Sequence, residues 1–180
     1  AMTELPVGNP SRNVVEIIFH TSWGGEKGFP GRIEMVFKVQ NLTRTVTRFE
    51  EYRETVKSRA KATAAVDGGD ENGRCVADGN EVMRFYCLGG AAAGGYELGW
   101  GGKEGGTAVR TYSGSGVAHE NAGGGWGRRA MLVARVISGR TFKKSESDSM
   151  VGFDSVIGED GELLVFDSRA LLPCFVIIYK

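Results

Sequence analysis

The stretch that decides the fold is GFDSVIGEDGELLVFDSRALLPCFVIIYK, residues 152–180. It contains an irregular part, a turn rich in glycine and acidic residues, and two hydrophobic runs, ELLVFD (162–167) and CFVIIY (174–179). Both runs are rich in residues that favour strands, so we expect two strands here. Glu162 stands between the turn and the first strand. A carboxylate at such a position either takes part in chemistry or simply faces water.

The first third of the chain predicts two further strands and one long helix. VVEIIF (14–19) is rich in β-formers and predicts a short strand. RIEMVFKVQ (32–40) alternates apolar and polar residues, which is typical of a half-buried strand. Residues 41–65 instead carry apolar side chains at helical spacing, which predicts an amphipathic helix of about 18 to 22 residues. We expect the loop at 67–80 to end this helix.

The middle of the chain combines clear strands with a glycine-rich segment. EVMRFYCL (81–88) and AMLVARVI (130–137) predict strands. Residues 89–127 hold 15 of the 28 glycines and are expected to be mostly loop, with one short strand at 107–113 and a helical turn at 116–122. One long helix near the N-terminus and six or seven strands, mostly after it, predict a single α+β domain over residues 1–180, with largely antiparallel sheets.

The composition narrows the classes of function. Lysine and arginine balance aspartate and glutamate, so the formal net charge is zero and no broad basic surface for nucleic acid is indicated. No apolar run reaches the roughly 18 residues that span a bilayer, so we expect no membrane partner. The three cysteines have no paired spacing, which favours a reducing, nuclear or cytoplasmic location. We expect Ala1 and Met2 to be a remnant of recombinant expression.

Common nucleotide-binding and metal-binding motifs are not found. Gly102-Lys103 is followed by Glu104, and Glu97 occupies the place of the first glycine of a P-loop. Residues 114–119 (GSGVAH) lack the third glycine of the dinucleotide fingerprint. His20, His119 and the dispersed cysteines have no metal-ligand spacing, so we expect no metal site.

Four segments, in their order and spacing, resemble the catalytic domain of the poly(ADP-ribose) polymerase family. They are RIEMVFKVQN with the following FEEYRETVK, then EVMRFYCLG, RAMLVARVISGR and FDSVIGEDGELLVFDSRALLPCFVIIY. The resemblance implies an ADP-ribosyltransferase-like fold with split antiparallel sheets, and NAD as the substrate. The phrases RFEEYRETVK, ADGNEVMRF and LLVFDSRALLPCF are similar to a group of plant zinc-finger proteins with a C-terminal domain of this kind. That similarity implies a domain of a longer, nuclear protein.

The resemblance assigns roles to individual residues. In the family a glutamate stabilises the cationic sugar as nicotinamide leaves, and Glu162 falls on this position. A histidine that holds a ribose hydroxyl is replaced here by Tyr86, and the glycine whose backbone binds the nicotinamide amide is replaced by Cys87. Val109 or Arg110 falls nearest the first aromatic position that flanks nicotinamide, with Tyr112 two or three residues away. His119 or Glu120 falls near the second.

These replacements leave three hypotheses. The altered positions favour a pseudoenzyme that keeps the fold, binds NAD or ADP-ribose weakly, or uses its surface for protein partners. The alternative is an active mono-ADP-ribosyltransferase in which Glu162 stabilises the transition state, Tyr86 holds ribose and Tyr112 stacks on nicotinamide. An unrelated α+β domain or a different enzymatic activity is the third, because fold resemblance alone does not establish function.

Overall fold

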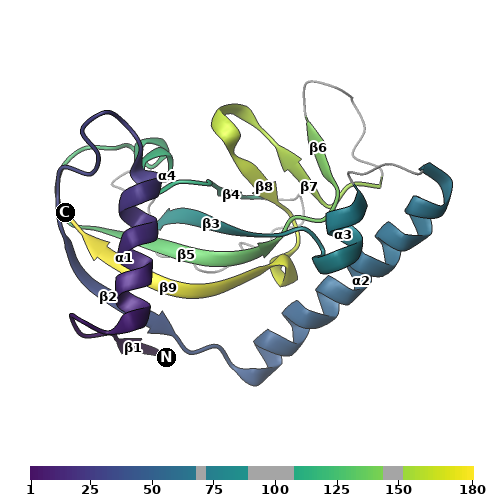
Figure 1. The fold of residues 1–180 in the computed structure, drawn as a ribbon, viewed down its shortest axis with the longest axis horizontal. Helices are drawn as coiled ribbons and strands as arrows, with labels where there is room; N and C mark the ends of the chain where they lie inside the picture. The colour runs from purple at the N-terminus through teal and green to yellow at the C-terminus, as the bar shows by residue number, and fades with distance from the viewer. Residues whose placement is uncertain (68–71, 89–107, 144–151) are drawn as a thin grey trace.

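The computed structural model describes residues 1–67, 72–88, 108–143 and 152–180 (Figure 1). In chain order the described elements are β1 (Met2–Glu4), α1 (Pro10–Trp23), β2 (Ile33–Val39), α2 (Thr43–Asp67), α3 (Asn72–Asp78), β3 (Glu81–Leu88), β4 (Val109–Thr111), α4 (Ser115–Asn121), β5 (Arg129–Ile137), β6 (Thr141–Lys143), β7 (Ser155–Ile157), the 3-10 helix η1 (Glu159–Gly161), β8 (Leu163–Val165), the 3-10 helix η2 (Ser168–Ala170) and β9 (Leu171–Tyr179). The predicted α+β class is confirmed.

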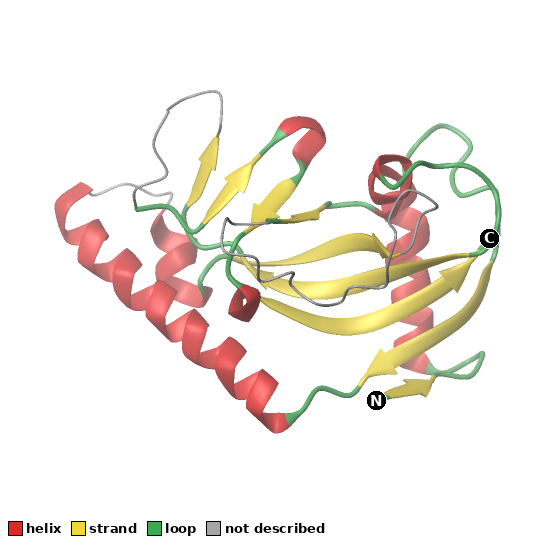
Figure 2. Ribbon diagram, turned by 180° about the vertical axis from the view of Figure 1, so that it is seen from behind, coloured by secondary structure: helices red, strands yellow, loops and turns green. Residues whose placement is uncertain are grey.

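The larger sheet has five strands in the order β1-β2-β9-β5-β3, and all neighbouring strands are antiparallel. The long hydrophobic strands β9 and β5 lie at its centre. Helix α1 crosses one face of this sheet, in front of it in Figure 1 and behind it in Figure 2. Strands that are covered on both faces need apolar residues at successive positions, which explains the continuous hydrophobic runs in β5 and β9.

The smaller sheet has the order β4-β8-β7-β6 and is antiparallel except for the parallel pair β6 and β7. An isolated bridge joins the two sheets. In it the amide of Phe85 donates to the Tyr112 carbonyl at 2.7 Å, and the Tyr112 amide donates back at 2.9 Å. Two largely antiparallel sheets are therefore present, as expected. That they form an ADP-ribosyltransferase fold remains a prediction.

Two hydrophobic cores lie on the two faces of the larger sheet. Strand β5 contributes to both, because its successive side chains point to opposite faces. Met131 and Val133 enter the first, the α1 core, whereas Leu132 and Ala134 enter the second, the α2 core. The α1 core also holds Phe19, Val36, Phe85, Cys87, Ile177 and Tyr179. The α2 core gathers buried residues of α2, β8 and β9, namely Phe49, Tyr52, Val56, Leu163, Val165, Leu172 and Val176.

The prediction of a strand at residues 14–19 is wrong, because this stretch lies within helix α1. The side chain of Asn9 caps the helix by accepting from the amides of Ser11 and Arg12, and Pro10 stands at the first turn. Val15 and Phe19, four residues apart, then point together into the α1 core. Capping and tertiary burial outweigh the β-propensity of the β-branched residues in this run.

Most other predicted elements are confirmed, with changed bounds. The strands expected at 32–40, 81–88 and 130–137 are β2, β3 and β5, and the early helix is α2, which is longer than expected at 25 residues. The two C-terminal runs are β8 and β9. Helix α3 occupies part of the predicted loop at 67–80, and β1, β6 and β7 were not predicted. In the glycine-rich segment β4 and α4 match the expected strand and helical turn, while residues 89–107 lie outside the described residues.

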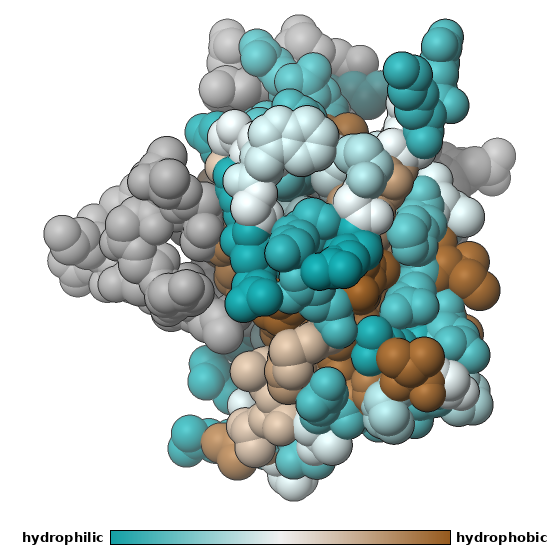
Figure 3. Space-filling view, turned by 90° about the vertical axis from the view of Figure 1, so that its left-hand side faces the viewer, coloured by the Kyte–Doolittle hydropathy of each residue, from teal (hydrophilic) through white to brown (hydrophobic). Residues whose placement is uncertain are grey.

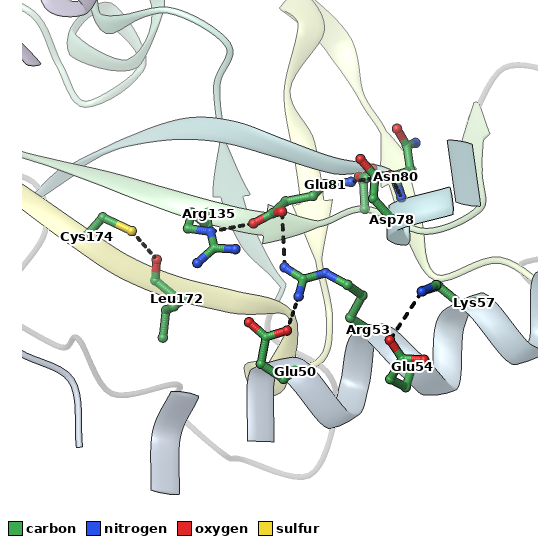
Figure 4. A network of polar contacts seen from close by, with 11 residues as sticks. Glu50, Arg53, Glu54, Lys57, Asp78, Asn80, Glu81, Arg135, Leu172 and Cys174 are labelled. Atoms are coloured by element: carbon green, nitrogen blue, oxygen red, sulfur yellow. Dashed lines mark hydrogen bonds and ion pairs between the residues drawn. The ribbon is translucent and has the colours of Figure 1, made fainter. Parts of the chain in front are cut away.

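A chain of ion pairs ties α2 to the larger sheet (Figure 4). Arg53 of α2 contacts Glu50 on its own helix and reaches Glu81 of β3 at 3.1 Å. Glu81 in turn pairs with Arg135 of β5. Both guanidinium groups lie over the ring of Phe49, 5.1 and 5.2 Å from its centroid. The network therefore fixes α2 against the start of β3 through charge and through stacking.

Arg84 joins β3 to the smaller sheet. Its guanidinium donates to the Thr111 hydroxyl at 3.1 Å, the Thr111 carbonyl at 2.9 Å and the Gly161 carbonyl at 2.9 Å. The Thr111 hydroxyl donates onward to the Leu163 carbonyl at 3.1 Å. Burial lowers the pKa of Arg84 to about 10, which still leaves it charged at neutral pH. One side chain thus positions both β4 and the turn that precedes Glu162.

Replacing Phe19 with alanine should destabilise the protein strongly. Phe19 is fully buried, so its loss removes apolar contacts and leaves a cavity, at a cost of about 3 to 5 kcal/mol in the free energy of unfolding. Ile17→Ala on the same helix is the matched control, because Ile17 is 60% exposed and should change stability by less than about 0.5 kcal/mol. Urea denaturation measures both variants. Equal losses in the two would contradict the assigned orientation of α1.

Arg84→Met should loosen the junction between the sheets while leaving the α1 core intact. The variant leaves the Thr111 and Gly161 carbonyls without a charged donor, a loss of about 1 to 3 kcal/mol. Amide hydrogen exchange should show faster exchange at Phe85 and Tyr112, whose amides form the bridge, and unchanged protection at Phe19. A uniform loss of protection across the chain would refute this local role.

Candidate functional site

Two of the predicted site residues, Glu162 and Tyr112, are in direct contact. The Tyr112 hydroxyl donates to Glu162 Oε2 at 3.4 Å. Burial raises the pKa of Tyr112, and the negative charge of Glu162 raises it further, so the phenol keeps its proton and acts as the donor. The pair lies beside the bridge between the sheets, because Tyr112 is the residue that pairs with Phe85. The site is therefore built at the junction of β3, β4 and β8.

The turn before β8 determines where the Glu162 carboxylate lies. The Glu162 amide donates to the Glu159 carbonyl at 3.0 Å, and the Glu162 carbonyl accepts from the Gly158 amide at 2.9 Å. Asp160 and Gly161 both have positive φ, 54° and 70°, which closes this tight turn. A Cβ at position 158 would collide with the Glu162 side chain, so the glycine there makes room for the carboxylate.

Tyr86 lies on the opposite face of β3 from its neighbour Cys87. It pairs in register with Leu132 and packs, half-buried, against the α2 core. No hydrogen bond joins its hydroxyl to Glu162, Tyr112 or any other residue in the part of the chain that the structure describes. The residue at the expected histidine position thus serves packing, with its phenol left for solvent or a ligand.

Cys87 and His119 meet at Tyr179, inside the α1 core. The Tyr179 hydroxyl lies 2.7 Å from His119 Nδ1 and 3.6 Å from Cys87 Sγ. His119 Nε2 lies 3.1 Å from the Gly125 carbonyl, which can only accept, so Nε2 carries the proton and Nδ1 accepts from Tyr179. Burial raises the pKa of Tyr179, which keeps it a donor. Both ring nitrogens of His119 are therefore engaged within the fold.

Tyr179 and Arg84 are the organising residues that the sequence reasoning missed. Tyr179 is the last residue of β9, and nothing in its local sequence marks it as a partner for His119 and Cys87, which are distant in the chain. Arg84 did leave a signal. In β3 it shares one face with Val82, Tyr86 and Leu88, so it is a charge on a core-facing stripe. Such a position requires strong partners and predicts a buried contact.

Three cavities lie away from the Glu162 carboxylate. One of about 200 Å³ lies between α1 and the larger sheet, one of about 560 Å³ lies along α2, and one of about 490 Å³ lies between α2 and η2. Glu162 lines none of these three. On the end of the molecule that lies to the left in Figure 1, hydrophilic side chains cover the centre and hydrophobic ones form separate groups around it (Figure 3).

Among the described residues, no three histidine, cysteine or acidic side chains are arranged to hold a metal ion. No helix in the described ranges is both long and apolar enough to cross a bilayer.

Two comparisons with known proteins identified no similar protein. No protein-family model matches the chain, and no curated protein is significantly similar to it. The resemblance to poly(ADP-ribose) polymerases therefore depends on sequence motifs alone.

Proposed function

We propose that the chain is a divergent, catalytically silent ADP-ribosyltransferase-like domain that serves mainly as a protein-interaction module and binds NAD or ADP-ribose weakly at most. The observation that carries this proposal is that the side chains of His119 and Cys87 are engaged in contacts within the fold. Both side chains contact the Tyr179 hydroxyl within the α1 core, so the His119 ring cannot flank nicotinamide without breaking that contact, and the Cys87 side chain takes space that a glycine would leave free.

The positions of Tyr86 and Glu162 also support the absence of catalytic activity. A group that holds the ribose of NAD must lie within about half an ångström of its productive position. A phenol at position 86 is longer than the imidazole of the family, and it packs on the face of β3 that points to the α2 core. The carboxylate of Glu162 keeps a partner in Tyr112, but it lacks the converging histidine that a working site requires.

One feature favours the alternative, an active mono-ADP-ribosyltransferase. The amide and carbonyl of Phe85 both point away from β5, toward Tyr112. Backbone groups on one edge of an antiparallel strand repeat every second residue, so those of Cys87 point to the same edge. The family uses the backbone of this position for the nicotinamide amide. A nicotinamide bound there would lie next to Tyr112, whose hydroxyl contacts Glu162.

An NAD titration by calorimetry tests the proposal directly. The unmodified chain should bind NAD with a Kd weaker than about 1 mM. Tyr86→His should tighten binding by about tenfold, because the shorter imidazole leaves room for ribose and donates to its hydroxyl. Tyr86→Phe is the matched control, since it removes the hydroxyl but keeps the bulk, and should give no gain. A Kd near 10 µM for the unmodified chain, about 7 kcal/mol of binding energy, would rule out silence.

Incubation with NAD labelled on the adenylate separates silence from weak turnover. The unmodified chain should transfer no more label to itself or to added protein than Glu162→Gln, which keeps the size of the side chain but lacks its negative charge. Label transfer by the unmodified chain that Glu162→Gln abolishes would overturn the proposal and establish the mono-ADP-ribosyltransferase alternative. Stability of Glu162→Gln is measured in parallel, so that unfolding is not mistaken for lost activity.

A further inference from the structure

The cavity of about 490 Å³ beside η2, here called the η2 pocket, is separate from the Glu162 site. Its walls come from α2, from the residues before β7 and from those after β8. Glu162 precedes β8, whereas Phe166 and Asp167 follow it. At about 3.3 Å per residue along a strand, the two ends lie roughly 13 Å apart. A ligand in the η2 pocket would therefore not depend on the proposed NAD site.

Tyr52, a buried tyrosine of α2, lines the η2 pocket. The residue is only 3% exposed. Within the described residues its hydroxyl makes no hydrogen bond, and it is not sealed from solvent, so it opens into the pocket. Burial raises the pKa of Tyr52 to about 12, with Asp154 and Asp167 adding to the shift, so the phenol remains a donor at neutral pH. The pocket thus offers a hydrogen-bond donor that lacks an acceptor.

Two arginines from different elements stand at the rim. Arg59 of α2 pairs with Asp154 at 3.2 Å, and Arg169 of η2 pairs with Asp167 through two nitrogens, at 3.0 and 2.7 Å. The Arg169 guanidinium also lies over the Tyr52 ring, 5.2 Å from its centroid. A guanidinium has five N–H donors, so both groups keep donors beyond those used for the aspartates. Their side chains are 58% and 46% exposed and can reach a ligand.

The lining of the η2 pocket holds two arginines and two aspartates, and two further arginines, Arg48 and Arg140, lie beside these aspartates. Arg48 is close enough to lower the pKa of Asp167, after the stronger effect of Arg169. Arg140 donates its backbone amide to Asp154 at 2.9 Å, and its guanidinium lies over Phe153. Four arginines thus surround two aspartates. Such an excess attracts anions and disfavours cations.

The same pocket has an aromatic wall. Phe153 and Phe166 both line it, and Phe166 is 39% exposed, which is high for a large apolar side chain. An aromatic ring stacked against such a wall would remove this apolar surface from water. The donors of Tyr52, Arg59 and Arg169 are best matched by a dianion with several oxygens, because it competes for arginine donors better than a single carboxylate does.

We propose that the η2 pocket binds an aromatic ring that carries a phosphate group. The phosphate accepts from Arg59, Arg169 and the Tyr52 hydroxyl, and the ring packs on Phe166. A phosphotyrosyl side chain of a partner protein carries the phosphate on the ring itself, and a nucleoside monophosphate offers an aromatic ring and a phosphate joined through its ribose. The inference is independent of the proposed function, because it uses none of the residues assigned to NAD.

The test is a titration of the ¹⁵N-labelled chain with phenyl phosphate, followed by NMR. Saturable shifts are expected at the amides of Phe153, Phe166 and Ser168, and inorganic phosphate alone should bind at least about tenfold more weakly. Arg59→Gln and Arg169→Gln should each weaken phenyl phosphate binding by about tenfold. Lys61→Gln is the matched control, since it removes a positive charge from the opposite face of α2. Loss of affinity equal to that of the arginine variants in this control would overturn the proposal.

Tyr52→Phe separates a ligand-binding role from a structural one. It should weaken phenyl phosphate binding several-fold while leaving thermal stability nearly unchanged, because the hydroxyl makes no hydrogen bond within the described residues. Unchanged affinity in this variant, or phosphate binding as tight as phenyl phosphate, would reject the assigned geometry. Parallel titrations with phosphotyrosine amide and adenosine monophosphate identify the source of the ligand, and tighter binding of either supports the site. No saturable shift with any of the three aromatic phosphates refutes it.

Discussion

The structure depends on covering both faces of β5 and β9 at the same time. These central strands are apolar at successive positions, so neither face can remain in water. Helix α1 closes one face through Val15 and Phe19, and α2 together with the smaller sheet closes the other. The junction between the sheets, where the bridge and Arg84 lie, follows from this arrangement because the smaller sheet has to meet the edge strand β3.

Much of the fold could be predicted from the sequence, since the patterns of β2, β3, β5 and α2 are strong and local. The stretch at 14–19 could not, because its helix depends on the Asn9 cap and on burial against strands far along the chain. The candidate site divides in the same way. Glu162 and Tyr112 are in contact, as the sequence motifs predict for residues of one site. Cys87 and His119 instead contact Tyr179, and these residues are too far apart in the sequence for a motif to reveal the contact.

In the proposed silent domain, Glu162 and Tyr112 stay in contact while Cys87 and His119 pack around Tyr179, which leaves recognition as the role of the surface. The ligand site proposed in the η2 pocket is one such surface. Its two arginines are paired with aspartates and about half exposed, so they can contact a ligand without a large cost of burial. Its position after β8, rather than before it, means that recognition and any residual chemistry can change independently.

Strand β9 lies between β2 and β5, so the centre of the larger sheet joins parts of the chain that are remote in sequence. The side-chain amide of Asn41 donates to the Pro173 carbonyl, 132 positions away in the sequence. Loop-closure entropy must be overcome before such pairs form, which predicts slow folding, on the order of milliseconds to seconds. Until β9 docks, β2 and β5 each expose a hydrophobic edge, and the unfinished sheet is the species most exposed to aggregation.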